Sequence, residues 1–134
     1  MKKKDLEDAL NITLNNSIVI FSFPGIGIGN TYPELSGCSL EVREMEKIAQ
    51  EFHALDIDFI GISTGTLPET SPYIKYIPVK NDLKSFQYIT KDNKRFIDRF
   101  TIFIHKDTII KKRIDNAEDN AMLVREWIEK IGRI

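Results

Sequence analysis

Two short runs of apolar residues mark the predicted centre of the fold. Residues 17–23 contain four consecutive apolar side chains between two asparagines and a Pro-Gly pair, and residues 57–63 have the sequence IDFIGIS. Uninterrupted apolar runs of this length, bounded by turn residues, are typical of strands that are buried on both faces. We therefore predict two central strands that pair in parallel.

The segment between these runs has apolar residues at helical spacing. Its apolar stripe repeats with a period near 3.6 and consists of Leu40, Met45, Ile48, Ala49, Phe52 and Leu55. The stripe predicts an amphipathic helix that begins near Cys38 and ends at about Ala54, with Ser36 or Ser39 as its cap. Strand, helix and strand then form a βαβ unit with a right-handed crossover.

The second half of the chain predicts antiparallel pairing. Residues 99–104, with the sequence RFTIFI, predict a strand, and Lys106-Asp107 predicts a turn. Residues 108–114 are then expected to return as an antiparallel strand. Apolar residues lie on one helical face of residues 116–131, which predicts the last helix.

Three segments have weaker patterns. Residues 2–10 have leucines at helical spacing, which indicates a loose turn or a short helix. Residues 73–79 alternate between apolar and polar side chains and end near a proline, which favours an edge strand or an irregular segment. Residues 81–94 give no assignment.

The order of these elements predicts the fold class. A parallel βαβ unit, a connection, a β-hairpin and a closing helix form the layout of a thioredoxin-like α/β protein, with a central mixed sheet flanked by helices. No repeat, low-complexity tract or linker interrupts the pattern, and the length of 134 residues suits one core. We expect a single domain over residues 1–134.

Composition and charge limit the classes of binding partner and of site that the protein is expected to have. The formal net charge of −1 favours neither nucleic acid nor an anionic membrane as a partner. No apolar stretch approaches the length of a membrane span, and no secretory leader pattern follows the first lysines, so we expect a cytoplasmic protein. With one cysteine and two histidines, His53 and His105, far apart in sequence, we expect neither a disulfide nor a metal site, and no cofactor is implied.

Cys38 is the candidate for chemistry. It follows the loop 24–37 and is expected to lie at the start of a helix, at the carboxyl edge of a parallel strand, where ligands bind in open α/β sheets. The N–H groups and the dipole of a helix N-terminus lower the pKa of a thiol and favour the reactive thiolate. The alternative is a small, buried and inert hydrophobic residue, since cysteine is among the most buried residue types.

Three segments resemble the catalytic core of the peroxiredoxins, in the order SIVIFSFPG, GCSLEVREMEKIAQEF and IDFIGIST. In that family an apolar strand that ends in an aromatic residue and a proline leads to a peroxidatic cysteine at a helix start. The later segment DLKSFQYITKDNKRFIDRFTIFIHKDTII is similar to a redoxin subgroup in which an arginine opens a hairpin strand. The resemblance runs from about Leu6 to Ile131, without the N-terminal strands that usually precede this core.

The resemblance implies a one-cysteine thiol peroxidase. Cys38 would attack hydrogen peroxide or an organic hydroperoxide and become sulfenic acid, and Arg99 would stabilise the thiolate and polarise the O–O bond. Glu41 would orient the arginine, and the backbone around Gly37 would bind the oxygens. The alternative for Arg99 is a surface residue of a strand.

The loop before the cysteine is longer than the family pattern. About seven extra residues follow Pro24, and either Thr31 or Ser36 is the candidate for the hydroxyl that the family places near the thiol. Gly25, Gly27 and Gly29 also raise the alternative of a nucleotide-binding turn, but the helix begins late and a proline intervenes. A flexible crossover is the favoured interpretation.

The partners follow from the same features. With no second cysteine to form a disulfide, an external thiol, either a thioredoxin-like protein or a small thiol, would reduce the sulfenic acid. An open sheet edge left by the absent N-terminal strands would favour a homodimer. The main alternative function is a thioredoxin-fold binding or interaction module without peroxidase activity. Acyl-transfer or isomerase chemistry at Cys38 would need a base, and neither histidine is placed near the cysteine in sequence.

Overall fold

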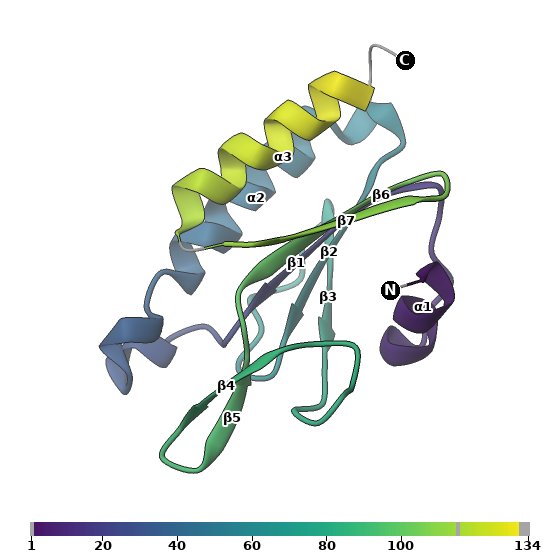
Figure 1. The fold of residues 1–134 in the computed structure, drawn as a ribbon. Helices are drawn as coiled ribbons and strands as arrows, with labels where there is room; N and C mark the ends of the chain where they lie inside the picture. Colours follow the sequence, from purple (N-terminus) through teal and green to yellow (C-terminus); the bar gives the residue numbers. More distant parts are fainter. Residues whose placement is uncertain (1, 115, 132–134) are drawn as a thin grey trace.

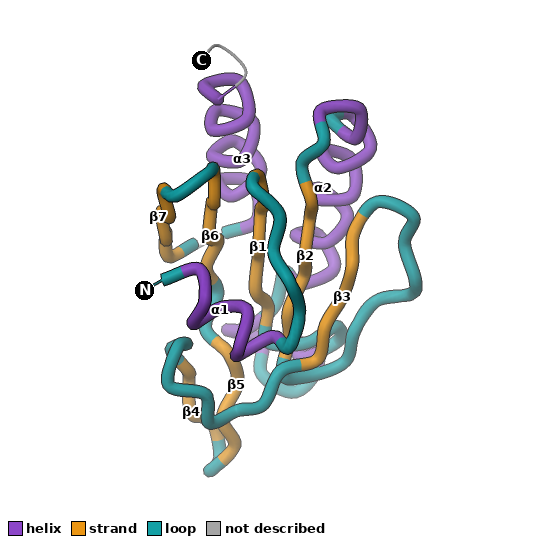
Figure 2. Tube along the Cα trace, turned by 90° about the vertical axis from the view of Figure 1, so that its right-hand side faces the viewer, coloured by secondary structure: helices purple, strands orange, loops and turns teal. Residues whose placement is uncertain are grey.

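A five-stranded mixed sheet forms the middle of the molecule, with helices on both faces (Figure 1). The structure is a computed structural model, and it describes residues 2–114 and 116–131. Figure 2 looks onto the sheet, with one short helix in front of it and two longer helices behind. The helices are α1 (Lys3–Leu10), α2 (Cys38–Glu51) and α3 (Ala117–Ile131), and the strands are β1 (Ser17–Phe23), β2 (Asp58–Ser63), β3 (Ile74–Pro78), β4 (Tyr88–Lys91), β5 (Lys94–Ile97), β6 (Phe100–His105) and β7 (Thr108–Arg113).

Strand β1 is the central strand, in the order β3-β2-β1-β6-β7. It pairs in parallel with β2, from Ile18 opposite Asp58 to Phe23 opposite Ser63, and antiparallel with β6. Strand β3 continues the parallel half of the sheet, and β7 continues the antiparallel half. The predicted fold class is therefore confirmed: the sheet is mixed, and its first half is a βαβ unit.

Alternate residues of β1 face two different apolar clusters. Val19, Phe21 and Phe23 pack among side chains of α2 and α3, whereas Ile18 and Ile20 pack toward α1. All five of these side chains are fully buried, as the uninterrupted apolar run predicted. The sheet is thus covered on both faces, and the carboxyl ends of β1 and β2 are left to carry loops.

Several boundaries differ from the predicted ones. Helix α2 ends at Glu51 rather than near Ala54, and a 3-10 turn at His53–Leu55 follows it. The chain leaves this turn through Asp56, which has a left-handed backbone with φ 55°. Helix α3 begins at Ala117 because Asn116 caps it: its side-chain oxygen accepts the Asp119 backbone N–H at 2.8 Å.

The segment without an assignment, residues 81–94, contributes to a separate two-stranded hairpin of β4 and β5. Its turn residues Asp92 and Asn93 both have positive φ angles, 49° and 66°. Two consecutive residues with positive φ form a tight two-residue turn of the kind that commonly joins the strands of a β-hairpin. The edge strand predicted for residues 73–79 is confirmed as β3, and the loose segment 2–10 is the helix α1.

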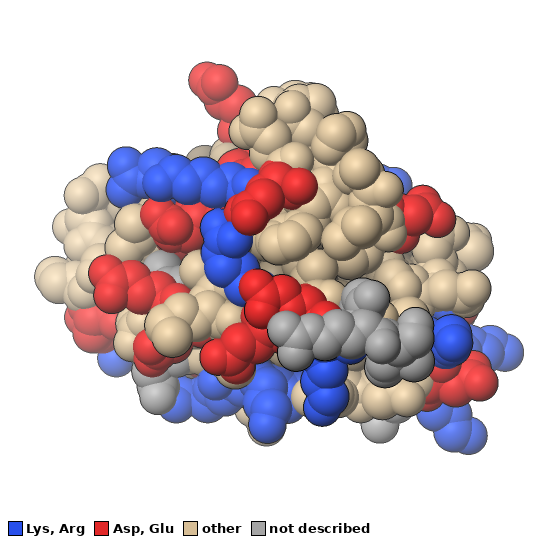
Figure 3. Space-filling model, turned by 90° about the horizontal axis from the view of Figure 1, so that it is seen from above, with Lys and Arg blue, Asp and Glu red and all other residues tan. Residues whose placement is uncertain are grey.

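Charged side chains of both signs lie on part of the face seen from above, beside a broad area without charges (Figure 3). Figure 3 shows acidic and basic side chains interspersed there, with no broad area of one sign. None of the helices within residues 2–114 and 116–131 is both long and apolar enough to cross a membrane. Strands β3 and β7 form the two edges of the main sheet, and the expected homodimer stays a prediction.

The contact between α3 and the sheet can be tested with a matched pair of substitutions. Ile128 is 1% exposed and packs in the cluster with β1, whereas Met122 on the same helix is 61% exposed. We expect Ile128→Ala to lower the free energy of unfolding by about 2–5 kcal/mol. Met122→Ala should change it by less than about 0.5 kcal/mol. Urea unfolding measures both, and equal losses would contradict the described packing.

Candidate active site

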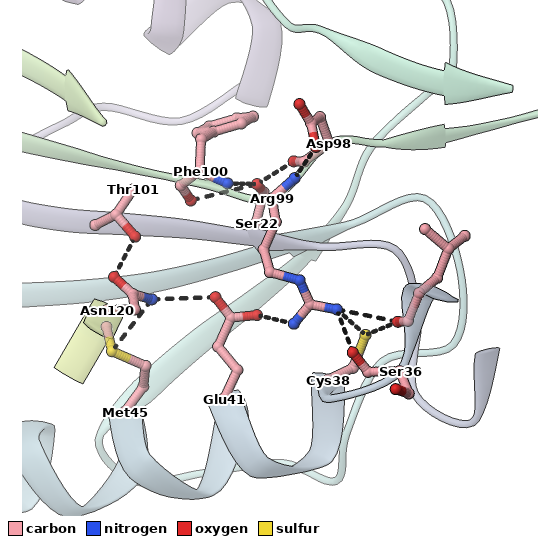
Figure 4. A network of polar contacts seen from close by, with 11 residues as sticks. Ser22, Ser36, Cys38, Glu41, Met45, Asp98, Arg99, Phe100, Thr101 and Asn120 are labelled. Atoms are coloured by element: carbon pink, nitrogen blue, oxygen red, sulfur yellow. Dashed lines mark hydrogen bonds and ion pairs between the residues drawn. The ribbon is translucent and has the colours of Figure 1, made fainter. Parts of the chain in front are cut away.

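Cys38 is the first residue of α2 and lies just beyond the carboxyl ends of β1 and β2 (Figures 1 and 4). The preceding residue, Gly37, has a left-handed backbone with φ 104°. A residue with a side chain would be strained in this conformation, so glycine is favoured here. The Gly37 carbonyl accepts the first helical hydrogen bond, from the Glu41 N–H at 2.9 Å. The helix therefore starts where the sequence predicted, but Gly37 is its N-cap in place of Ser36 or Ser39, and no side chain caps it.

The thiol is enclosed by its own loop and by Arg99. Cys38 is only 2% exposed, and its Sγ lies 3.3 Å from Arg99 Nη2. The Sγ–H group points to the Leu35 carbonyl at 3.8 Å. Sulfur is thus in position to donate a weak hydrogen bond as a thiol or to accept one from the guanidinium as a thiolate.

Arg99 is buried, so the alternative of a surface strand residue is wrong. It precedes β6, which begins at Phe100 rather than at Arg99 as predicted. Its Nη1 donates to Glu41 Oε2 at 3.0 Å, and its Nη2 lies near the carbonyl oxygens of Leu35 and Ser36 at 3.1 and 3.2 Å. Figure 4 shows the guanidinium between the carboxylate and the cysteine. The arginine fork thus joins three parts of the chain.

Glu41 is fully buried one turn after the cysteine. One carboxylate oxygen accepts from Arg99, and the other accepts from Asn120 Nδ2 at 3.0 Å. Burial raises the pKa of Glu41 to about 7, although the Arg99 charge and the hydrogen bonds from Asn120 and Arg99 act in the opposite direction. The carboxyl group therefore changes its charge near neutral pH.

Burial also raises the pKa of the Cys38 thiol. A hydrogen bond from the Gly25 backbone and the nearby Arg99 charge lower it, and the Glu41 charge raises it again. The expected decrease of the thiol pKa is therefore wrong in direction, because the loss of hydration outweighs the donors that surround the sulfur. At neutral pH the thiolate is the minor form.

A hollow of about 260 Å³ lies beside the cysteine. Its lining includes Gly25 and Gly29 from the crossover loop, together with Ser36, Gly37 and Cys38. A Cβ atom on Gly29 would lie 2.7 Å from the Ser36 side chain, so only glycine allows this part of the loop to approach so closely. The predicted glycine-rich crossover therefore forms one wall of a site next to the thiol.

The predicted hydroxyl partners make no side-chain hydrogen bond to the sulfur among the described residues. Ser36 and Gly37 line the hollow with Cys38, whereas Thr31 ends a 3-10 turn and is not part of the lining. Within the described residues, the hydrogen bonds that reach Sγ involve neither hydroxyl. The extra residues of the crossover form the 3-10 turns Ile28–Asn30 and Pro33–Leu35.

The β4–β5 hairpin supports the crossover loop from outside. The Tyr32 and Phe96 rings lie 5.6 Å apart, and Lys91 Nζ lies 3.1 Å from Glu34 Oε1. These contacts join the hairpin to the second 3-10 turn before Cys38, Pro33–Leu35, and to the residue that caps it. The segment that had no assignment from sequence is therefore packed against the loop that forms the hollow.

Two further residues complete the polar network. Asn120 of α3 and Thr101 of β6 are both fully buried, and Thr101 Oγ1 lies 2.6 Å from Asn120 Oδ1. The sequence held one signal for Asn120: it lies four residues before Val124 and eight before Ile128, on the apolar face of the helix. A polar residue in such a stripe needs a buried partner. Thr101 gave no comparable signal.

The part of the chain that the structure describes contains no set of side chains suited to bind a metal ion. No group of three or more His, Cys, Asp or Glu side chains there is arranged to hold an ion. His53 contacts the Tyr73 ring, and His105 Nδ1 lies 2.9 Å from Ser17 Oγ. Neither histidine has a recorded contact with Cys38, so the candidate chemistry remains that of a thiol beside an arginine.

Comparison with solved structures identifies similar folds. A Xanthomonas campestris chain described as peroxiredoxin Q is 14% identical, with a TM-score of 0.52 over 81% of this chain and 75% of that one. A second, the Xanthomonas campestris bacterioferritin comigratory protein, is 13% identical, with a TM-score of 0.51 over 81% and 74%. No family model matches the chain. No curated protein matches it significantly.

The sheet, the two helices behind it and the cysteine at a helix start define a thioredoxin-like α/β protein. The two similar structures have the same fold, and both are described as peroxiredoxin-type proteins. The resemblance seen in the sequence is therefore confirmed at the level of the fold.

The raised pKa of Glu41 predicts a pH-dependent stability. The folded state holds this proton more tightly than the unfolded state, so its contribution is complete below about pH 4.5 and is lost as the pH rises through about 7. Relative to Glu41→Gln, the free energy of unfolding of the wild type should fall by up to about 3 kcal/mol over that range. Urea unfolding at several pH values measures the difference, and parallel curves for the two proteins would contradict it.

Proposed function

We propose that the protein is a thiol-dependent peroxidase that reduces hydrogen peroxide or organic hydroperoxides through Cys38, with an external thiol as reductant. One observation carries the proposal: Cys38 Sγ lies at a helix start, 3.3 Å from the buried guanidinium of Arg99, on the wall of a small hollow. A thiolate, a fixed cation and backbone donors around one small space suit attack on a polar O–O bond.

The reaction balances with these groups and one added reductant. The Cys38 thiolate attacks one peroxide oxygen, a S–O bond forms, and the O–O bond breaks. The leaving hydroxide or alkoxide takes a proton and departs as water or an alcohol. Cys38 is then a sulfenic acid, and two thiol groups of the reductant return it to the thiol with release of water and a disulfide.

Each neighbouring group has a role in this proposal. Arg99 Nη2 would donate to the thiolate and then to the peroxide oxygen as negative charge moves onto it. Glu41 would hold the guanidinium in that orientation, through the 3.0 Å contact with Nη1. Gly37 and Ser36 belong to the wall of the hollow, where peroxide would enter. Thr31, the other predicted substrate-binding residue, is not part of that wall.

The size of the hollow supports a small substrate. Since one water accounts for about 30 Å³ of liquid, a space of about 260 Å³ admits hydrogen peroxide or a small organic hydroperoxide. The bacterioferritin comigratory protein, the second similar structure, is described as having alkyl peroxide reduction activity. A cytoplasmic setting, where small thiols and thioredoxin-like proteins keep cysteines reduced, would supply the reductant.

A binding or interaction module without peroxidase activity is the second candidate. The observation that favours it is the thiol itself, which is 2% exposed and has a raised pKa. Buried thiols in this state are usually inert. The two candidates differ in whether peroxide oxidises Cys38 faster than it oxidises an ordinary free thiol.

Peroxide consumption tests the proposal directly. With excess dithiothreitol, the wild type should consume hydrogen peroxide above the background of the thiol alone, and Cys38→Ser should fall to that background. A sulfenic-acid reagent should label Cys38 of the wild type after one equivalent of peroxide. Absence of both signals would sink the peroxidase and leave the binding module.

The role of Arg99 has a matched control on α2. Arg99→Gln removes the guanidinium beside Sγ, and the rate of peroxide reduction should fall by about 10–1,000-fold. Arg43→Gln removes an equal charge from an exposed position, and its rate should stay within about twofold of the wild type. Equal rates for both variants would contradict the role of Arg99.

The raised thiol pKa predicts the pH dependence of the reaction. Below its pKa the thiolate fraction grows by up to about tenfold for each pH unit, and the second-order rate with peroxide should grow with it. Stopped-flow measurements between about pH 6 and about pH 9 test this. A rate that is already level at neutral pH would indicate a lowered thiol pKa instead.

A further inference from the structure

The polar network does not end at the arginine. On the far side of Glu41, Asn120 Nδ2 donates to the carboxylate oxygen that Arg99 leaves free, and Thr101 Oγ1 contacts the amide oxygen of Asn120 (Figure 4). We propose that Asn120, oriented by Thr101, is a positioning residue that holds Glu41 in its ionised form and thereby controls the reactivity of Cys38. Its importance for catalysis rests on the proposed peroxidase function, whereas its effect on the thiol does not.

The geometry assigns the orientation of the Asn120 amide. Its Oδ1 can only accept, so the Thr101 hydroxyl must donate across the 2.6 Å contact. The amide NH₂ group then faces Glu41 Oε1 at 3.0 Å, with Met45 Sδ at 3.9 Å as a second, weak acceptor. Without the Thr101 donor, the amide could turn and present its oxygen to the carboxylate. The hydroxyl of β6 therefore selects which face of the amide the carboxylate meets.

Because these residues are buried, the orientation of the Asn120 amide affects the pKa of Glu41. Glu41, Thr101 and Asn120 are all fully buried, between α2, β6 and α3. A hydrogen bond to the ionised form of a buried carboxyl lowers its pKa, and loss of that donor raises it. The same bond opposes the burial that raises the pKa of Glu41 to about 7. The amide thus acts on a group that already titrates near neutral pH.

Few other groups contribute to this titration. Among the described residues, the ionisable groups that act on Glu41 or respond to it are Arg99, on the strand side, and Cys38, on its own helix. Helix α3 contributes the uncharged Asn120. Because the Glu41 charge raises the pKa of Cys38, ionisation of Glu41 opposes ionisation of the thiol. A change at Asn120 is therefore expected to reach the sulfur through Glu41 and Arg99.

The signature is a shoulder in the pH profile of thiol alkylation. While Glu41 is neutral, the rate of Cys38 alkylation by iodoacetamide grows with pH. As Glu41 ionises near pH 7, the growth slows, and it resumes above that range. The Glu41→Gln variant, which cannot ionise at this position, should lack the shoulder. The same midpoint should appear in the ¹³C titration of the Glu41 carboxyl carbon.

The experiment compares two changes at one position. Thr101→Val removes the hydroxyl and keeps the shape, so the midpoint of the shoulder and of the Glu41 titration should move up by about one pH unit. Thr101→Ser keeps the donor and should restore the wild-type midpoint. Asn120→Leu should give a shift at least as large as that of Thr101→Val. A network that is merely structural would lower the unfolding temperature of these variants and leave the midpoint where it is.

The outcomes separate the inference from the proposed function. A midpoint that is unchanged in both Thr101→Val and Asn120→Leu overturns the positioning role, whatever the peroxidase assay gives. A shifted midpoint with no peroxide consumption supports the positioning role and removes the peroxidase. If the variants do not fold, the wild type decides: the side-chain NH₂ resonances of Asn120 should titrate with the Glu41 midpoint, and resonances that do not change with pH overturn the proposal.

Discussion

The buried ion pair between Arg99 and Glu41 is the interaction on which the site depends. It joins the entrance of β6 to the first turn of α2, with 3.0 Å between Nη1 and Oε2 and a carboxylate that is fully buried. Removing two charges from water costs several kcal/mol each, so such a pair is stable only if the remaining polar atoms are also satisfied. Two backbone carbonyls on the arginine and one amide on the glutamate meet that condition. Among the described residues, no buried side-chain nitrogen or oxygen lacks a partner.

The two partners of this pair differ in how far the sequence could predict their surroundings. The buried run of β1 and the apolar stripe of α2 are local patterns, and they predicted the βαβ unit and the position of Cys38. The burial of Arg99 follows from a contact 78 residues apart in the chain: the Phe100 N–H donates to Ser22 Oγ at 2.9 Å, and that hydroxyl donates to the Asp98 carbonyl. These bonds fix the backbone on both sides of Arg99. No local periodicity could have predicted them.

The conformation of the crossover loop could not be predicted from local sequence patterns either. Its glycines indicated flexibility, but its conformation comes from partners that lie far away in sequence. Ile26 N–H donates to the Thr66 carbonyl at 2.8 Å, and Tyr32 packs on Phe96 of a hairpin that had no assignment. A hydroxyl bonded to the thiol was expected from Thr31 or Ser36, but Ser36 only lines the hollow beside Cys38, and Thr31 is not part of that lining. The sequence could identify the cysteine and the arginine, but it could not predict the shape of the space between them.

The reactivity of Cys38 is then a balance between its burial and the hydrogen bonds and charges around the sulfur. Burial raises the thiol pKa, whereas the Gly25 backbone and the Arg99 guanidinium lower it. The Arg99 charge is shared with Glu41, so its effect on sulfur depends on whether that carboxyl is ionised. When Glu41 is neutral, the positive charge of Arg99 stabilises the Cys38 thiolate without opposition. When Glu41 is ionised, its negative charge offsets part of that stabilisation. Since this carboxyl titrates at about pH 7, the sulfur meets two different electrostatic environments within the neutral range. The polar network behind Glu41 therefore bears on the chemistry in front of it.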